Sequence, residues 1–114
     1  MQMKKQSNNY LENVFEKNSE YKFESDADGQ VTIFVENKGL FNKIAQTLLK
    51  KPKVSQVHLE KFGSFVWNQV DGQRDVVAIG KLVEEHFGDE AKPVYERLSV
   101  YMKNLENMDF IKKI

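Results

Sequence analysis

Two histidines are the side chains of this chain best suited to bind a metal ion. His58 lies in a segment of alternating apolar and polar residues, and His86 lies near the end of a segment with helical spacing. A metal site would need the fold to bring both together with carboxylates. We favour the alternative that each is a surface or partly buried histidine. The chain has no cysteine, which excludes disulfides, thiolate catalysis and cysteine-ligated zinc.

A short run of carboxylates resembles the first half of a calcium-binding loop. Glu24, Asp26 and Asp28 alternate and are followed by Gly29. A calcium loop would begin with aspartate and would close with a bidentate glutamate at the position that Val35 occupies. The Asp-Gly pair instead suits the positive φ angles of a tight hairpin turn, so we interpret the run as a turn between two strands. The sequence predicts no metal and no cofactor.

The sequence offers little for nucleophilic catalysis or nucleotide binding. Ser64 and Ser99 have no base nearby in the pattern, so surface or capping roles are favoured for these hydroxyls. The glycines are scattered and form neither a P-loop nor a dinucleotide-binding fingerprint. We therefore expect that the protein is not an enzyme.

Hydrophobic periodicity indicates which elements must position any site. Alternating residues predict two antiparallel strands over 21–24 and 31–36 and a third strand over 54–59. Helical spacing predicts a short helix over 40–50, closed by Pro52, and then three helices in succession. These three cover about 61–70, about 75–87 with Asp75 as N-cap and Gly88 as end, and the segment from Pro93 to Leu105.

The two ends of the chain carry weaker signals. Residues 1–9 are polar and are expected to be frayed, and the apolar residues from Tyr10 to Phe15 are consistent with one or two helical turns docking on the body. Phe110 and Ile111 predict a short closing segment. We expect one domain over 1–114, in which 1–18 is a partly disordered N-terminal extension.

The last predicted helix carries an apolar stripe and a second row beside it. At about 100° per residue, Val94, Leu98, Tyr101 and Leu105 fall together, and Tyr95 and Met102 fall to one side. One interpretation is that Tyr95 and Met102 only widen the buried face. The other is that they line a groove next to it, since tyrosine and methionine suit adaptable peptide contacts.

The third predicted strand offers the other wall of such a groove. If it lies at a sheet edge, its unpaired N–H and C=O groups can accept an extended peptide. Backbone pairing alone would be marginal, at about 0.5–1.5 kcal/mol per hydrogen bond against about 8 kcal/mol for micromolar binding. The candidate peptide-binding residues therefore come from both elements: Val54, Ser55, Gln56, Val57, His58, Leu59, Tyr95, Leu98 and Met102.

Residues 54–111 resemble the PqqD family, whose members act in pyrroloquinoline quinone synthesis and related modified-peptide pathways. The most specific part is the string Val66-Trp67-Asn-Gln-Val-Asp71-Gly72, followed by Arg74 and Val76. Further matching positions are Val57-His-Leu59, Phe65, Val70, Ile79, Tyr95, Leu98 and Leu105.

The resemblance implies an α+β fold that is winged-helix-like, with a three-stranded antiparallel sheet followed by a three-helix bundle. It also implies binding of the leader of a ribosomally made precursor peptide, which is presented to a radical-SAM or other modifying enzyme. The peptide would add beside Val54–Leu59 and pack against Tyr95, Leu98 and Met102. The helix predicted within Asn37–Lys53, inserted between the second and third strands, departs from the family pattern and leaves the peptide cargo open.

Charge separates this function from its alternatives. Lysine and arginine number 17, equal to aspartate and glutamate, so the chain lacks the basic excess of most nucleic-acid binders. A winged helix that binds DNA is the alternative, but residues 84–106 contain six acidic and three basic residues, a net charge of −3. A regulatory protein-interaction domain that could form a homodimer is the third interpretation. Without a signal peptide or a long apolar run, the chain is expected in the cytoplasm with no membrane partner.

Overall fold

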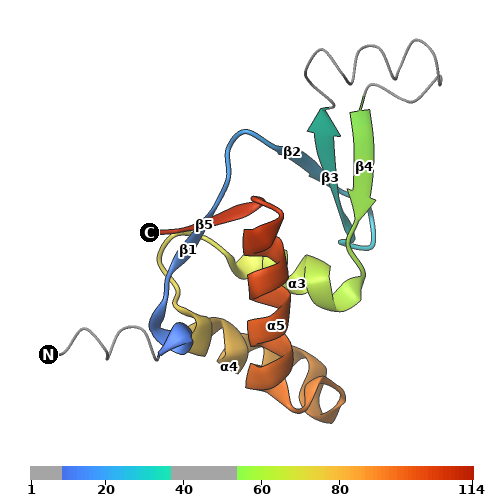
Figure 1. Cartoon of the computed structure of the whole chain (residues 1–114). Coiled ribbons are helices and arrows are strands. Elements are labelled where there is room, and N and C mark those ends of the chain that lie inside the picture. Colours follow the sequence, from blue (N-terminus) through green and yellow to red (C-terminus); the bar gives the residue numbers. More distant parts are fainter. Residues whose placement is uncertain (1–8, 37–53) are drawn as a thin grey trace, which may run out of the picture. The chain divides into compact units, whose positions relative to one another are not determined.

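The computed structural model describes residues 9–36 and 54–114, and within them the chain folds as an α+β protein with antiparallel sheets and three α-helices. Its contacts group into two compact units, one formed by Ser19–Ser64 and the other by the N-terminal residues up to Asn18 together with Phe65–Ile114. Figure 1 shows the order of the elements along the chain. The helix predicted over 40–50 and Pro52 lie outside the described residues.

The Ser19–Ser64 unit contains a three-stranded antiparallel sheet, as the alternation predicted. Its strands are β2 (Lys22–Ser25), β3 (Val31–Glu36) and β4 (Val54–His58), in the order β2-β3-β4. Val31 and Ile33 of β3 are fully buried, while every residue of β2 is exposed. One face of this sheet is therefore a core face, which explains the period of two in β3.

The turn between β2 and β3 is a hairpin with a glycine bulge. Asp26 N–H donates to the Gln30 carbonyl and Gly29 N–H donates to the Asp26 carbonyl, at 2.9 and 3.0 Å. The Asp26 carboxylate also accepts from the N–H groups of Asp28 and Gln30, both at 2.9 Å. The positive φ is at Gly29 (85°) and not at Asp28. The prediction of a turn is confirmed, with one left-handed residue as in a bulged hairpin loop.

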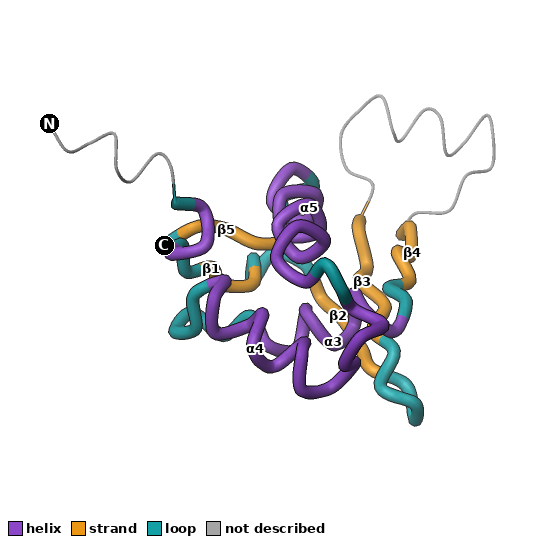
Figure 2. Tube along the Cα trace, turned by 90° about the horizontal axis from the view of Figure 1, so that it is seen from below, coloured by secondary structure: helices purple, strands orange, loops and turns teal. Residues whose placement is uncertain are grey.

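The other unit is built on helices and a small second sheet. Its helical elements are α3 (Lys61–Gln69), within which the boundary between the units falls, α4 (Val76–Phe87) and α5 (Val94–Asn107). A 3₁₀ turn, η2 (Gly88–Ala91), joins α4 to α5. Strand β1 (Phe15–Lys17) pairs antiparallel with β5 (Ile111–Lys113), and Figure 2 shows the two strands side by side.

Local signals explain where the helices begin and end. The Asp75 carboxylate accepts a hydrogen bond from Ala78 N–H at 2.9 Å, which satisfies one of the open donors at the start of α4. Gly88 ends α4 with a φ of 63°, and Gly72 ends the turn after α3 with a φ of 80°. Pro93 precedes α5 as its N-cap residue. The predicted N-cap at Asp75 and the predicted end of α4 at Gly88 are confirmed.

The core of the helical unit collects the apolar residues of all its elements. Trp67 is fully buried, and the ammonium of Lys17 lies 5.5 Å from the centroid of its ring. The other buried apolar residues of this unit are Phe15, Val66, Val70, Val76, Ile79, Val83, Ala91, Val94, Leu98, Met102, Leu105, Phe110 and Ile111.

The N-terminal region differs from the prediction of one or two helical turns. Tyr10–Glu12 forms a single 3₁₀ turn, η1, and the chain then becomes extended, so that Phe15 is buried and Glu16 is exposed. The reason is tertiary pairing: Phe15 opposes Lys113 and its carbonyl accepts from Gly72 N–H at 2.9 Å. Phe110 and Ile111 do form the closing segment, and Ile111 begins β5. Among the described helices, none has the length and hydrophobicity that crossing a bilayer requires.

Candidate functional site

Strand β4 lies at an edge of its sheet. It pairs with β3 over Val54–His58, and among the described residues no strand pairs with its other side. Figure 1 shows β4 beside β3 with this second side, here called the outer edge, facing away from the sheet. The condition on which peptide addition depends, a strand paired on one side, is therefore met by the described part of the chain.

The register determines which backbone groups point to the outer edge. Leu59 N–H donates to the Val31 carbonyl at 2.8 Å, so Val31 and Leu59 occupy a hydrogen-bonded position of the ladder. Hydrogen-bonded and non-hydrogen-bonded pairs alternate along antiparallel strands. Ile33 with Val57 and Val35 with Ser55 are therefore hydrogen-bonded pairs. The N–H and C=O groups of Val54, Gln56 and His58 consequently point to the outer edge.

A buried serine completes the inner side of the ladder where β4 ends. The Ser64 hydroxyl accepts from Val31 N–H at 2.8 Å and donates to the Leu59 carbonyl at 3.1 Å. It thus takes the place of the missing bond between Val31 and Leu59, and the chain can turn into α3 without leaving those groups unpaired. Ser64 is 3% exposed, so it serves the structure, as the capping interpretation of this hydroxyl proposed.

The side chains of β4 divide between two faces. Gln56 and His58 are exposed, Ser55 and Val57 are half-buried, and Leu59, just after the strand, is 7% exposed. Val57 lies opposite the fully buried Ile33. An added strand would continue both faces, so its residues would alternate between an apolar and a polar environment.

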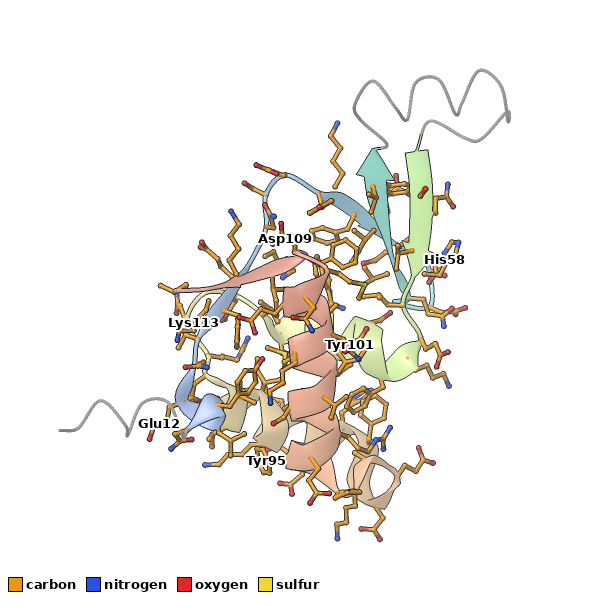
Figure 3. The ribbon with its side chains drawn as sticks, viewed as in Figure 1. Glu12, His58, Tyr95, Tyr101, Asp109 and Lys113 are labelled. Carbon is orange, nitrogen blue, oxygen red and sulfur yellow. The ribbon has the colours of Figure 1, made fainter. Side chains whose placement is uncertain are left out.

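His58 is held on the polar face by its neighbour on β3. Thr32 lies directly opposite it, and the distance from Thr32 Oγ1 to His58 Nδ1 is 2.9 Å. Figure 3 labels His58 on β4. The contact leaves the Nε2 atom on the other side of the ring.

The strand edges of the two sheets differ in charge. The exposed strand β2 carries Lys22 and Glu24, and β5 carries Lys112 and Lys113. Strand β4, with the sequence VSQVH, has no lysine, arginine, aspartate or glutamate. Charged residues, lysine above all, commonly protect edges against pairing. The outer edge of β4 lacks this protection.

The residues predicted on the last helix have structural contacts in their own unit. Leu98 and Met102 have no exposed surface. Tyr95, labelled in Figure 3, is half-buried, and its hydroxyl donates to the Val77 carbonyl of α4 at 3.2 Å. Burial raises the pKa of this hydroxyl, and the charges of Glu84 and Asp75 raise it further. Of the two interpretations of Met102, the one in which it widens the buried face agrees with its burial.

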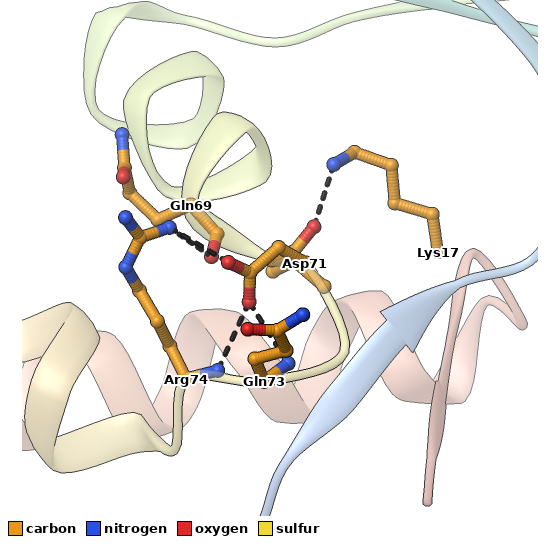
Figure 4. Close-up of polar contacts among 6 residues, drawn as sticks. Lys17, Gln69, Asp71, Gln73 and Arg74 are labelled. Atoms are coloured by element: carbon orange, nitrogen blue, oxygen red, sulfur yellow. Dashed lines mark hydrogen bonds and ion pairs between the residues drawn. The ribbon is translucent and has the colours of Figure 1, made fainter.

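The string that carries the family resemblance covers the end of α3 and the connection to α4. The Asp71 carboxylate accepts from Gln73 N–H and Arg74 N–H, both at 2.9 Å, and pairs with the Arg74 guanidinium at 3.0 Å (Figure 4). The Arg74 guanidinium also donates to the Gln69 carbonyl at 3.4 Å. These N–H donors, and then the guanidinium charge, hold the pKa of Asp71 below its ordinary value. Most of the string is thus explained by folding.

Lys17 links β1 to the connection between α3 and α4 by a hydrogen bond. Its ammonium donates to the Val70 carbonyl at 2.6 Å (Figure 4). Burial lowers the pKa of Lys17, and the nearby charge of Asp71 partly opposes this effect.

The second histidine lies among aromatic rings. The His86 ring stacks on Phe65 with centroids 4.4 Å apart and meets Phe87 edge-on at 4.7 Å. In the part of the chain that the structure describes, no three histidine, aspartate or glutamate side chains are placed to hold a metal ion.

Comparison of the chain with protein-family models, with curated proteins and with solved structures gave no match. The resemblance to the PqqD family therefore stays a prediction from the sequence. The candidate site rests on the outer edge of β4, and two of its features were not expected from the sequence: the Thr32–His58 contact and the outward direction of the Gln56 and His58 backbone. Both depend on the register between β3 and β4, which a single sequence does not specify.

Proposed function

We propose that this protein binds an extended peptide segment by adding it as a strand to the outer edge of β4. The observation that carries the proposal is an edge strand without charged residues whose Val54, Gln56 and His58 backbone groups point away from its sheet. Strand addition uses such groups as donors and acceptors and reads side chains at alternate positions.

The resemblance described above suggests the biological setting. In this proposal the fold is winged-helix-like, and the bound segment is the leader of a ribosomally made precursor peptide that is presented to a radical-SAM or other modifying enzyme. Tyr95 belongs to the other compact unit, where its hydroxyl donates to the Val77 carbonyl, and it is left out of the proposed site. Leu98 and Met102 are left out of the proposed site because they have no exposed surface.

Energetics require side-chain contacts in addition to backbone pairing. Each backbone hydrogen bond is worth about 0.5–1.5 kcal/mol net, and micromolar binding needs about 8 kcal/mol. Val57 on one face of β4 and the exposed His58 on the other are the side chains that we expect an added strand to contact. We therefore expect binding to depend on peptide sequence.

Gln56→Pro tests the proposal, because it removes an N–H that points outward and leaves the bonds between β3 and β4 in place. Proline is tolerated in edge strands at such positions. The matched control is Gln56→Val, which changes the same side chain but keeps the N–H. The probes are dodecapeptides selected on the wild-type protein from a random phage-displayed library, with binding measured by fluorescence anisotropy.

Binding of the selected peptides should fall at least tenfold in Gln56→Pro and change less than about threefold in Gln56→Val. In ¹⁵N-labelled protein, the same peptides should shift the amide signals of Val54–Leu59. Equal binding to both variants, or shifts restricted to other elements, would refute strand addition. If Gln56→Pro fails to fold, peptides N-methylated at alternate amides replace it, and only one of the two methylation phases should abolish binding.

Self-association is the competing use of the same edge. A wild-type dimer in light scattering that is dissociated by Gln56→Pro, together with no selected peptide, would overturn peptide recognition in favour of an oligomerising domain.

A further inference from the structure

The environment of His58 specifies the chemistry of a segment added at β4. Thr32 Oγ1 and His58 Nδ1 form a hydrogen bond at 2.9 Å. A threonine hydroxyl can donate or accept, so it accommodates either state of Nδ1. Because Nδ1 is engaged by Thr32, Nε2 is the ring nitrogen that can donate to an acidic group of an added strand.

The ladder places one residue of an added strand beside His58. Because the N–H and C=O of His58 point to the outer edge, the residue opposite it in an antiparallel partner would lie in a hydrogen-bonded pair. The Cβ atoms of directly opposed residues are about 4.5–5.5 Å apart, on the same face of the sheet. An aspartate or glutamate at that position would bring its carboxylate within reach of the imidazole.

The charge of the chain segment that leads into β4 favours an acidic partner. The register places Lys22, Glu24 and Glu36 on the face that carries His58, and β4 carries no charged residue of its own. Residues 37–53, which lead into β4 and lie outside the described residues, contain five lysines and no acidic residue by sequence. Positive charge in the adjoining chain raises the local concentration of anionic peptides.

The opposite face of β4 selects apolar residues on either side of the acid. Val57 is half-buried and lies opposite the buried Ile33, so neighbours of the residue beside His58 would face this apolar surface. We propose that β4 binds an acidic strand: an extended segment with alternate apolar residues and a carboxylate opposite His58. This proposal rests on the proposed function, because it specifies the peptide that the outer edge recognises.

The test uses two nonapeptides that differ in one group. The first is Thr-Val-Thr-Val-Asp-Val-Thr-Val-Thr with a terminal fluorophore, and the second carries asparagine in place of the aspartate. Both are titrated against the wild-type protein, His58→Val and Gln56→Val. Valine keeps the strand and the outward N–H at either position, so Gln56→Val is the control for a change on the same face. The fold of each variant is checked by circular dichroism.

The wild-type protein and Gln56→Val should prefer the aspartate peptide about two- to fivefold, the range typical of an exposed charged pair. In His58→Val the preference should fall to less than about 1.5-fold. The dodecapeptides selected on the wild-type protein should also be enriched in acidic residues flanked by apolar ones.

The outcomes separate this inference from the proposed function. Peptides whose binding requires the Gln56 N–H but not the carboxylate, or an aspartate preference that persists in His58→Val, would overturn the acidic-strand proposal and leave strand addition intact. If the wild-type protein shows no preference for the aspartate peptide and no peptide binds Gln56→Pro more weakly, strand addition is overturned as well. The comparison of the two peptides on the unaltered protein stands even if His58→Val does not fold.

Discussion

The ring of Tyr95 in α5 lies directly on the backbone of Gly80 in α4. A methyl group added at position 80 would overlap the ring, and the Tyr95 hydroxyl is fixed by its bond to the Val77 carbonyl at 3.2 Å. Glycine in the middle of a helix usually costs up to about 1 kcal/mol relative to alanine. Here the missing side chain makes room for the tyrosine.

Gly80→Ala should therefore destabilise the protein by about 1–3 kcal/mol, because the ring must move out of a packed position. In the Tyr95→Ala background the same substitution should become stabilising, by up to about 1 kcal/mol, since only helix propensity remains. Urea unfolding of the four proteins measures both effects. The same sign of the Gly80→Ala effect in both backgrounds would show that the two residues are not coupled.

Ser64→Ala should lower the free energy of unfolding by about 1–3 kcal/mol, because it removes the partner of the Val31 N–H and the Leu59 carbonyl in a buried position. Ser99→Ala, in the half-buried part of α5, should change stability by less than about 0.5 kcal/mol and serves as the control. Thermal and urea denaturation check both. A neutral Ser64→Ala would mean that other groups satisfy these atoms.

Hydrogen exchange should alternate along β4 in the unbound protein. The amides of Ser55 and Val57 face β3 and should be protected, whereas those of Gln56 and His58 face the outer edge and should exchange at least tenfold faster. Residue-resolved exchange by NMR measures this pattern. Protection of Gln56 and His58 that grows with protein concentration would instead point to pairing between two copies of the chain.

Leu98→Ala and Met102→Ala should each destabilise the protein by about 2–5 kcal/mol, because both side chains are fully buried. Val100→Ala is the control on the same helix. Its side chain is 61% exposed, so we expect a change below about 0.5 kcal/mol. Denaturation midpoints compare the three variants. Small effects at Leu98 and Met102 would contradict their place in the core of the helical unit.

The contribution of Asp71 to the free energy of unfolding should depend on pH. Its pKa in the folded protein is below the ordinary value of 3.8, so its contribution is complete above that value and is lost as pH falls through the folded pKa. The stability difference between the wild type and Asp71→Asn should therefore be present at pH 7 and shrink below about pH 4. Urea unfolding at a series of pH values measures it. A difference that does not vary with pH would contradict the assignment.

The sequence predicted those features that depend on local interactions. The N-cap at Asp75, the glycine end at Gly88 and the turn at Gly29 each rest on residues within a few positions of one another. The alternation of β3 follows from one buried face. These signals are complete within a single window of sequence.

Features that depend on distant residues were missed. Strands β1 and β5 are three residues long and come from the two ends of the chain, so neither carries a periodic signal strong enough to predict their pairing. Met102 was set beside the apolar stripe of α5 at about 80° from Val94. The buried face of α5 lies closer to Met102 than the apolar stripe predicted. Tyr101, at the other side of the stripe, is only half-buried.

The phase of the β3–β4 ladder has a consequence for selectivity. Since the outward backbone groups recur at every second residue, a bound chain can slide along this margin only in steps of two. A displacement by one residue would exchange the side chains of the bound peptide between the apolar and the polar face of the sheet. The outer edge therefore discriminates between peptides by the order of their apolar and polar residues. Peptides of identical composition but shuffled order should be rejected.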